Sequence, residues 1–354
     1  MKRALRAGLA GLLGLLTTPL FASALKPDEE VLFVPTVARS GNDGRVSVPV
    51  EAWVHEHEPR RGAMPLFARW LKLDLDELSA EDRERFVART QLFRVDSERG
   101  KVLRVRFADG LEADLPRTRD GGRSRTAVEV SASLADDRGW IGFEVVLPGS
   151  DPRRLAGRSL HVPAAGLSVV SDIDDTIKHS QVHERRELLL NTFLRPFTAA
   201  PDMAVRYREL AGTASTRFHY VSASPLQLLP ALEGFLQTQG FPSGSLHLRE
   251  TTSLARLWRS DSRRHKQAAI EALLRDFPQR RFLLVGDSGE ADPEIYADLA
   301  RAHPGQVVGI AIREVGGATA DAERYRRTFA GLAPALWQVF TDAADWRTDR
   351  HDAR

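Results

Sequence analysis

The spacing of hydrophobic positions divides the chain into two halves. Between about residue 31 and residue 165, apolar and polar residues alternate in short runs such as VLFVPTVA, RVSVPVEAWV and WIGFEVVL. Clusters rich in Gly, Asp and Pro separate these runs. Alternation with a period of two indicates strands with one buried face. This half therefore predicts a β-rich domain, an antiparallel sandwich or barrel.

One segment of this half has helical instead of alternating spacing. It covers residues 66–93, LFARWLKLDLDELSAEDRERFVARTQLF. The SAED tetrapeptide inside it is typical of a helix start, with Ser79 as the N-cap. We expect this helix to pack on the β-rich sheet.

From residue 167 onward, strand-like runs alternate with helical segments. The runs LSVVSD, RFHYVSAS, LHLRE, RFLLVGDS and QVVGIAIR are compact and apolar. Segments with helical spacing lie between them, for example DMAVRYRELAG and RRHKQAAIEALLRDF. This alternation predicts an α/β domain with a parallel sheet covered on both faces. The later segment 323–346 predicts a further helix.

The first 24 residues have the order of a secretory signal peptide. A basic start, MKRALR, precedes a short apolar stretch, and Ala22-Ser23-Ala24 forms an A-x-A cleavage site. An uncleaved anchor is the alternative, although the stretch is short for a membrane span. We therefore predict an exported protein, periplasmic or secreted. The predicted divisions are a signal peptide (1–24), a β-rich domain (25–165), an α/β domain (166–316) and a C-terminal helical segment with a tail (317–354).

Charge and cysteine content exclude several classes of function. The whole chain has 50 basic and 48 acidic residues. Three of the basic residues and no acid lie in the signal segment, so the remainder has 47 basic against 48 acidic residues. This balance does not support a general nucleic-acid-binding surface. The absence of cysteine excludes disulfides, thiol catalysis and a lipid anchor on cysteine.

Polar residues follow several of the predicted parallel strands, at the edge where such sheets carry their sites. LSVV runs into Asp172 and Asp174, and FHYV runs into Ser222. FLLV runs into Asp287, with Asp292 five residues later. Carboxylates this close repel one another unless a cation lies between them. A hard divalent ion with oxygen ligands, most plausibly Mg²⁺, fits this set, and a solvated acidic turn is the alternative.

The order of these motifs resembles that of the haloacid-dehalogenase superfamily. Its four elements are matched in order by DIDDT, VSAS, Lys266 and GDSGEAD. The longer phrases SDIDDTIKHS, YVSASPLQLLP, HKQAAI and LLVGDSGEADPEIY are similar to the App1 phosphatidate phosphatase catalytic domain family, over about residues 167–313. The resemblance implies a haloacid-dehalogenase-like Rossmannoid sheet with a small cap insertion, preceded by the β-rich domain.

The resemblance also implies a role for each matching residue. Asp172 would be the nucleophile that forms an aspartyl-phosphate, and Asp174 would act as general acid and then as base. Thr176 would orient Asp174. Ser222 would bind the phosphoryl group, and Lys266 would neutralise it. The implied Mg²⁺ ligands are Asp172, Asp174, Asp287 and Asp292.

Several of these assignments have rivals. Ser224 competes with Ser222, although it could instead cap the helix that follows. Asp292 could be only a helix N-cap, and two neighbouring arginines, at positions 263 and 264, compete with Lys266. The GDSG sequence around Ser288 is not a nucleophile elbow, because position 290 is Glu where Gly is required. We expect its two glycines to let the backbone turn sharply.

The resemblance implies a Mg²⁺-dependent phosphatase that converts phosphatidate to diacylglycerol. The insertion after DIDDT is small and apolar and includes ELLLNTFLRPFTAAPDM. It would leave the site open to a phospholipid at a membrane surface, with Lys178, His179 and Arg249 as candidates for the entrance, although its apolar residues could equally pack on the core. The alternatives are an exported phosphomonoesterase with another substrate and a non-catalytic lipid- or protein-binding module.

Overall fold

The computed structural model of the protein describes residues 25–41, 43–56, 68–69, 72–212, 215–250, 262–316 and 322–348. The predicted signal peptide lies outside the described residues. Within these ranges, none of the helices is both long enough and apolar enough to cross a membrane.

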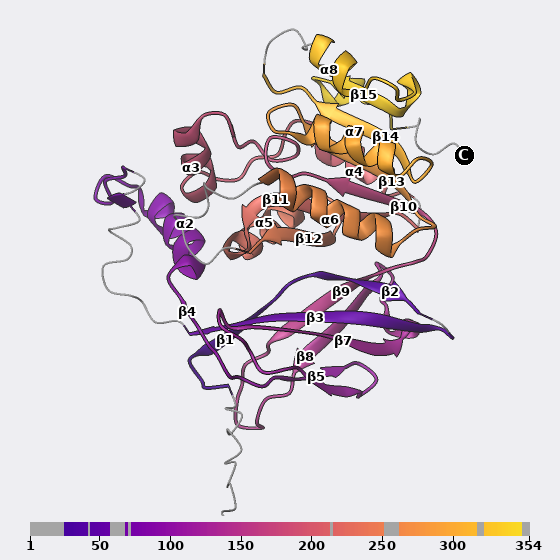
Figure 1. The fold of residues 1–354 in the computed structure, drawn as a ribbon. Coiled ribbons are helices and arrows are strands. Elements are labelled where there is room, and N and C mark those ends of the chain that lie inside the picture. Colours follow the sequence, from indigo (N-terminus) through magenta and orange to yellow (C-terminus); the bar gives the residue numbers. More distant parts are fainter. Residues whose placement is uncertain are drawn as a thin grey trace, which may run out of the picture.

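Six strands form an all-parallel sheet in the order β12-β11-β10-β13-β14-β15 (Figure 1). The first strand in sequence, β10, is central, and the chain adds β11 and β12 on one side before it returns to add β13 on the other. This reversal creates a switch point at the carboxyl end of β10, where α/β sheets bind ligands. The predicted α/β fold is confirmed. The bounds are β10 (Leu167–Ser171), β11 (Arg217–Pro225), β12 (Gly244–Arg249), β13 (Arg281–Asp287), β14 (Val307–Arg313) and β15 (Trp337–Phe340).

Helices cover both faces of this sheet because successive strand residues point to opposite sides. Val169 of β10 lies in one core with the buried faces of α4 and α5. Val170, the next residue, lies in a second core with α6 and α7. The sheet is therefore enclosed, as its near-continuous apolar strands require. The bounds are α4 (Met203–Leu210), α5 (Leu229–Thr238), α6 (Ser262–Asp276) and α7 (Asp292–Ala302), with the short η3 (Leu226–Leu228) before α5.

The C-terminal segment differs from the helix predicted for residues 323–346. A helix, α8 (Ala322–Thr328), begins it, but a strand and two short turns follow: β15, η5 (Pro334–Leu336) and η6 (Ala343–Asp345). Gly331 adopts a φ of 81°, and Pro334 lacks the N–H that a helix needs. The aromatic and β-branched run WQVF then pairs with β14 and extends the sheet.

The N-terminal half forms a nine-stranded sheet, which confirms the prediction of a β-rich domain. The sheet is mixed instead of antiparallel, because β2 pairs with β9 in parallel. Its long strand β3 shares one hydrophobic core with β8, although the two strands are not neighbours in the sheet. The sheet is therefore strongly curved and encloses this core. The bounds are β1 (Glu29–Phe33), β2 (Thr36–Ser40), β3 (Arg45–Glu56), β4 (Asp96–Ser97), β5 (Arg104–Phe107), β6 (Glu112–Asp114), β7 (Arg123–Ser131), η2 (Ala132–Leu134), β8 (Trp140–Val145) and β9 (Ala156–Val162).

The predicted helix of the N-terminal half forms, but it packs elsewhere than expected. Helix α2 (Ala80–Thr90) begins at Ser79, whose hydroxyl accepts a hydrogen bond from the N–H of Asp82 at 3.1 Å, as an N-cap does. Its Phe86 is fully buried in the core that covers β10 and β11. Helix α2 therefore lies beside α3 (Arg185–Phe193) of the α/β domain (Figure 1). Phe93 of the following η1 (Gln91–Phe93) packs against Phe193 of α3, with ring centres 5.7 Å apart. The expected packing on the β-rich sheet is wrong.

Candidate functional site

Three buried aspartates meet at the carboxyl edge of the parallel sheet. Asp172 directly follows β10, Asp287 ends β13, and Asp292 is the first residue of α7. Each side chain contributes one carboxylate oxygen, and these atoms lie within 4.8 Å of one another. The three residues come together because β10 and β13 are neighbours and α7 follows β13 after a short loop. This aspartate group could bind a metal ion.

The ammonium of Lys266 lies at the centre of the surrounding acids. Its Nζ is 2.7 Å from a carboxylate oxygen of each of Asp172, Glu290 and Asp292. Burial by itself would lower the pKa of Lys266, but these carboxylates outweigh burial and raise the pKa well above its usual value. Lys266 is therefore a permanent cation. Its rival Arg263 instead pairs with Asp298 at 3.1 Å, where both side chains are half exposed.

The aspartate group has more negative charge than Lys266 can neutralise. Burial raises the pKa of Asp172, Asp287 and Asp292, and Lys266 only partly opposes this rise. A cation among the three carboxylates would remove the repulsion between them. Three carboxylate oxygens without nitrogen or sulfur form a donor set that suits a hard divalent cation.

The two glycines of GDSG allow close approach, and Gly289 also lies in a bend of the backbone that follows β13. Neither has a positive φ. A Cβ on Gly286 would lie 2.4 Å from a carboxylate oxygen of Asp292, and one on Gly289 would lie 2.8 Å from an oxygen of Asp287. Real Cβ atoms do not come this close. Both glycines therefore leave the space that these two carboxylates occupy, a role that the sequence analysis did not predict.

Thr176 contacts the nucleophile candidate, not Asp174 as the sequence analysis expected. Its hydroxyl donates to Asp172 Oδ2 at 2.9 Å and also lies 3.3 Å from Asp287 Oδ2. The N–H of Ile177 bonds to the carbonyl of Ile173 at 3.0 Å, so the chain makes a helical turn here. A residue four positions on then faces back toward the start of the turn. Thr176 thus links two of the three aspartates.

The carboxylate of Asp174 lies outside the aspartate group and has its own ring of donors. Ser180 Oγ and Lys178 Nζ each lie 2.8 Å from its Oδ1. Ser222 and Ser224 both donate to its Oδ2, at 3.0 and 2.9 Å. The arrangement does not bring the Asp174 side chain to the other proposed ligands, and its role as a ligand stays a prediction. Ser224 does not cap the following helix, because its hydroxyl bonds to Asp174.

These donors determine the charge of Asp174. Burial would raise its pKa, but Lys178 and the hydroxyl donors together outweigh burial and hold the pKa below its usual value. Asp174 is therefore a carboxylate at neutral pH in the ligand-free site. Lys178, almost fully buried, is its direct ion-pair partner. The candidate entrance residue Lys178 is thus part of the site itself, whereas the side chain of His179 is exposed.

Two acidic residues at the site were missed by the sequence analysis. Asp175, in the left-handed region at φ 58°, accepts hydrogen bonds at 2.7 Å from the N–H groups of residues 180, 181 and 182. It fixes the loop that carries Ser180. Glu290 contacts Lys266, and its place in GDSGEAD, between two site aspartates, was the available signal.

Asp292 and Ser288 have roles that the sequence left open. The N-cap position of α7 is Ala291, with no side-chain cap bond, so Asp292 is not a simple cap. Its Oδ2 instead accepts the N–H of Asp287 at 3.3 Å. The hydroxyl of Ser288 points to Glu314, to which it donates at 2.8 Å, and accepts the N–H of Val315 at 3.0 Å. Ser288 therefore supports the loop through these two bonds.

A cavity of about 270 Å³ opens beside Asp174. Its polar lining includes Asp174, Ser224, Arg249 and Glu290. Its apolar wall comes largely from α3 and the loops next to it. The apolar lining residues are Val182, Leu188, Leu189, Phe193, Ala223, Pro225 and Leu228.

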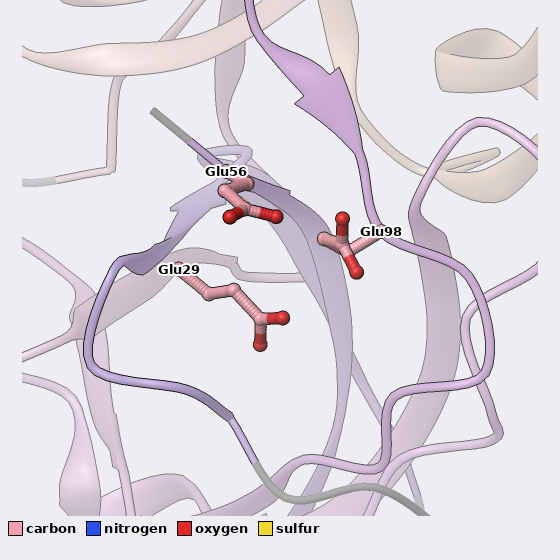
Figure 2. Close-up of side chains that lie close together, drawn as sticks. All are labelled: Glu29, Glu56 and Glu98. Carbon is pink, nitrogen blue, oxygen red and sulfur yellow. The ribbon is translucent and has the colours of Figure 1, made fainter. Parts of the chain in front are cut away.

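A second acidic cluster lies in the β-rich half and has its own cations. Figure 2 shows Glu29, Glu56 and Glu98, which come from three separate segments. Lys101 contacts Glu29 and lies 3.7 Å from Glu98. Lys26 lies 3.6 Å from both Glu29 and Glu56. Two lysines thus offset these three glutamates, and the cluster gives no reason to place a metal ion there.

Comparison with known proteins identifies the segment that carries the aspartate group. Residues 167–314 match the family model described as the catalytic domain of phosphatidate phosphatase APP1. Over 169 residues the chain is 34% identical to phosphatidate phosphatase APP1 of Saccharomyces cerevisiae, an alignment that covers 46% of this chain and 28% of the yeast protein. Residues 167–314 belong to the APP1 catalytic domain family.

A second relative has a similar level of identity to this chain. An uncharacterised protein of Schizosaccharomyces pombe is 33% identical over 154 residues, which cover 42% of this chain and 25% of that protein. The chain thus spans less than a third of the length of either relative. We refer to residues 167–314 as the APP1-type domain, and this segment contains the aspartate group, Lys266 and the partners of Asp174.

Proposed function

We propose that the APP1-type domain hydrolyses a phosphomonoester with the help of Mg²⁺, and that its substrate is phosphatidate, which it converts to diacylglycerol and phosphate. The observation that carries this proposal is the meeting of Asp172, Asp287, Asp292 and Lys266 at one sheet edge. Phosphoryl transfer depends mainly on positioning and on neutralisation of charge, and this set supplies both.

The residues would divide the reaction into two steps. Asp172 attacks phosphorus, and the bond between phosphorus and the leaving oxygen breaks as that oxygen takes a proton from Asp174. Because Asp174 is a carboxylate in the ligand-free site, the proton that it passes on would come from the ammonium of Lys178, 2.8 Å away, and would return to Lys178 after the second step. In the second step Asp174 takes a proton from the water that attacks the aspartyl-phosphate, and Asp172 and phosphate are released.

The other residues would hold the phosphoryl group and the ion. Asp172, Asp287 and Asp292 would bind Mg²⁺, which when bound would neutralise charge on the phosphoryl oxygens. Lys266 would add a second positive charge and, together with the ion, would favour the ionised form of Asp172. The hydroxyls of Ser222 and Ser224, which now bond to Asp174, would be available as donors to the phosphoryl group.

The cavity beside Asp174 supports an apolar leaving group. Its wall of leucines and Phe193 would be a poor surface for a sugar or another polar alcohol. Burial of apolar area there would instead favour an alcohol with acyl chains. This is the physical support for phosphatidate in place of a small polar ester.

Phosphate release by the purified protein tests the proposal. Dioctanoyl phosphatidate and p-nitrophenyl phosphate would be assayed with Mg²⁺ and with EDTA, for the wild type, Asp172→Asn and Asp298→Asn. Asp298 is a half-exposed residue of α7 that serves as a matched control. We expect the wild type to release phosphate with Mg²⁺ and EDTA to abolish this turnover. Asp172→Asn should reduce the rate by at least about a thousandfold, whereas the rate of Asp298→Asn should stay within about twofold of the wild-type rate.

The outcomes separate the parts of the proposal. If no ester is hydrolysed in the presence of Mg²⁺, the chain is not a phosphatase, and a binding module becomes the better hypothesis. Turnover of p-nitrophenyl phosphate without turnover of phosphatidate would refute only the lipid substrate. Equal rates for the wild type and Asp172→Asn would refute the aspartyl-phosphate.

We also propose that the protein is exported and loses residues 1–24. The support is the basic, apolar and A-x-A order of that segment. N-terminal sequencing of the protein recovered from its native cells should then begin at Leu25, and a mature protein that begins at Met1 would contradict export by cleavage.

A further inference from the structure

Helix α2 lies outside the APP1-type segment in sequence but beside the candidate site in space. It belongs to the N-terminal half, and in Figure 1 it lies against α3, away from the β-rich sheet. Helix α3 supplies Leu188, Leu189 and Phe193 to the apolar wall of the cavity. The contact between α2 and α3 therefore joins the N-terminal half to the proposed substrate cavity.

Arginines of α2 hold the C-terminal end of α3. The buried guanidinium of Arg89 donates to the carbonyls of Thr192 at 2.9 Å and Arg195 at 2.6 Å. Arg85 donates to the carbonyl of Leu194 at 2.8 Å. The last carbonyls of a helix have no partner within the helix and carry partial negative charge, so cations there stabilise the helix end. Burial and Arg85 lower the pKa of Arg89 to about 9, which leaves it charged at neutral pH.

Helix α3 in turn carries contacts to the partners of Asp174. The side-chain amide of Asn191 donates to the carbonyl of Ser180 at 3.0 Å, and Ser180 donates to Asp174. One turn of the same helix supplies Leu188 and Leu189 to the cavity wall. The position of α3 thus affects part of the apolar wall and one of the donors around Asp174.

A second line of contacts joins Arg89 to the same carboxylate. The guanidinium carbon of Arg89 lies 3.6 Å from the ring centre of Phe197, and Lys178 Nζ lies 4.8 Å from it. Cations over an aromatic face are attracted to it. Phe197 thus contacts both Arg89 and the lysine that pairs with Asp174.

We propose that Arg89, from outside the APP1-type segment, is a positioning residue that makes the phosphatase selective for esters with an apolar leaving group. It does so by fastening α3 where its leucines and Phe193 line the cavity. The inference rests on the proposed function. It adds that the selectivity depends on the N-terminal half of the chain, whereas the aspartate group and Lys266 have no contact with Arg89 among the described interactions.

Two substrates with the same phosphate ester and different leaving groups test this inference. Dioctanoyl phosphatidate carries acyl chains, and sn-glycerol 3-phosphate does not. We expect Arg89→Ala to reduce the ratio of their kcat/KM values about tenfold or more, mainly through a higher KM for phosphatidate, with the value for glycerol phosphate within about threefold of wild type. Glu84→Ala, on the exposed face of α2, should leave the ratio unchanged, and Arg89→Lys should give an intermediate ratio.

The outcomes distinguish three cases: Arg89 determines substrate selectivity, Arg89 only stabilises the fold, or the proposed phosphatase function is wrong. An unchanged ratio in Arg89→Ala, whether both rates fall or neither does, would overturn the inference, because a purely structural role affects both substrates alike. If Arg89→Ala does not fold, Arg85→Ala must lower the ratio in the same direction, and an unchanged ratio there would overturn it as well. If the wild type hydrolyses neither ester, the proposed function fails, and this inference fails with it.

Discussion

At the scale of single residues, the loop after β13 separates a chemical role from a supporting one. Asp287 is fully buried among carboxylates and Thr176, whereas the hydroxyl of Ser288, next to it, bonds to Glu314. The two neighbours point to opposite sides because they continue the alternation of a strand. Their substitution should therefore have very different consequences.

Replacement of Asp287 by Ala should lower the phosphatase rate about a hundredfold or more, because it removes one of three carboxylates for the ion. Ser288→Ala should keep the rate within about tenfold and lower the free energy of unfolding by about 1 kcal/mol, the usual loss for a hydrogen bond. Steady-state rates at saturating Mg²⁺ and urea unfolding would measure the two effects. A larger loss of rate in Ser288→Ala than in Asp287→Ala would contradict the roles assigned to both residues.

Single residues also show why part of the site could be predicted from sequence. Asp172 and Asp287 follow apolar strands, and parallel strands bring such ends to one edge, so pattern alone predicts their meeting. Lys266 could be chosen over its neighbours only through the resemblance. The partner of Thr176 could not be predicted, because the chain leaves strand geometry after Asp172 and strand alternation no longer applies.

At the scale of elements, hydrophobic spacing predicted that a helix or strand forms more reliably than it predicted which other elements that helix or strand packs against. The apolar face of α2 indicates that the helix is buried on one side, but it does not indicate against what, and the nearby β-rich sheet was the wrong choice. The helix predicted for residues 323–346 was wrong for a different reason. Its WQVF run is a short apolar strand that spacing alone cannot distinguish from part of a helix.

A buried histidine connects three neighbouring strands and makes their pairing sensitive to pH. His219 of β11 faces Ser168 of β10 at 3.1 Å and Ser245 of β12 at 2.8 Å, one through each ring nitrogen. Burial is the main reason that its pKa lies well below the usual value, and His247, Arg280 and Arg217 lower it further. The folded protein therefore keeps His219 neutral at pH values where the unfolded chain binds a proton.

This difference predicts a loss of stability in mild acid. The contribution of His219 is complete above the unfolded pKa of about 6.5 and falls by about 1.4 kcal/mol per pH unit below it, until the pH reaches the folded pKa. Urea unfolding between pH 7.5 and pH 5 should show a smaller dependence on pH for His219→Gln than for the wild type. His179→Gln, at an exposed position, is the control and should behave as the wild type does. An equal slope in His219→Gln would exclude this histidine as the cause.

At the scale of the whole molecule, the β-rich half and the APP1-type domain are joined by several direct contacts. The indole N–H of Trp140 donates to Ser243 at 3.1 Å, and Arg217 donates to the carbonyl of His161 at 3.0 Å. Together with the α2–α3 contact, these bonds place the two halves on one another along their length (Figure 1). The segment that matches the APP1 family is thus only part of the structure that supports its own site.

Residues 163–166, which connect β9 to β10 and form the linker between the halves, are held by one buried arginine. Arg280 is almost fully buried just before β13, and its guanidinium donates to the carbonyls of Pro163 at 2.9 Å, Ala165 at 2.7 Å and Ser215 at 2.8 Å, as well as to Ser168 Oγ at 2.9 Å. The first two carbonyls belong to the linker. A planar guanidinium can serve this many acceptors at once, which a lysine ammonium cannot.

Loss of this arginine should therefore destabilise the whole chain without touching the aspartate group. Arg280→Met keeps an apolar stem but leaves several buried acceptors without a donor, so the free energy of unfolding should fall by about 3–5 kcal/mol. Arg280→Lys should lose less, because three of its donors remain. Arg275→Met, at an exposed position of α6, provides the matched control, with an expected change within about 0.5 kcal/mol. Urea unfolding measures all three, and a loss below about 1 kcal/mol for Arg280→Met would mean that the linker is held by other contacts.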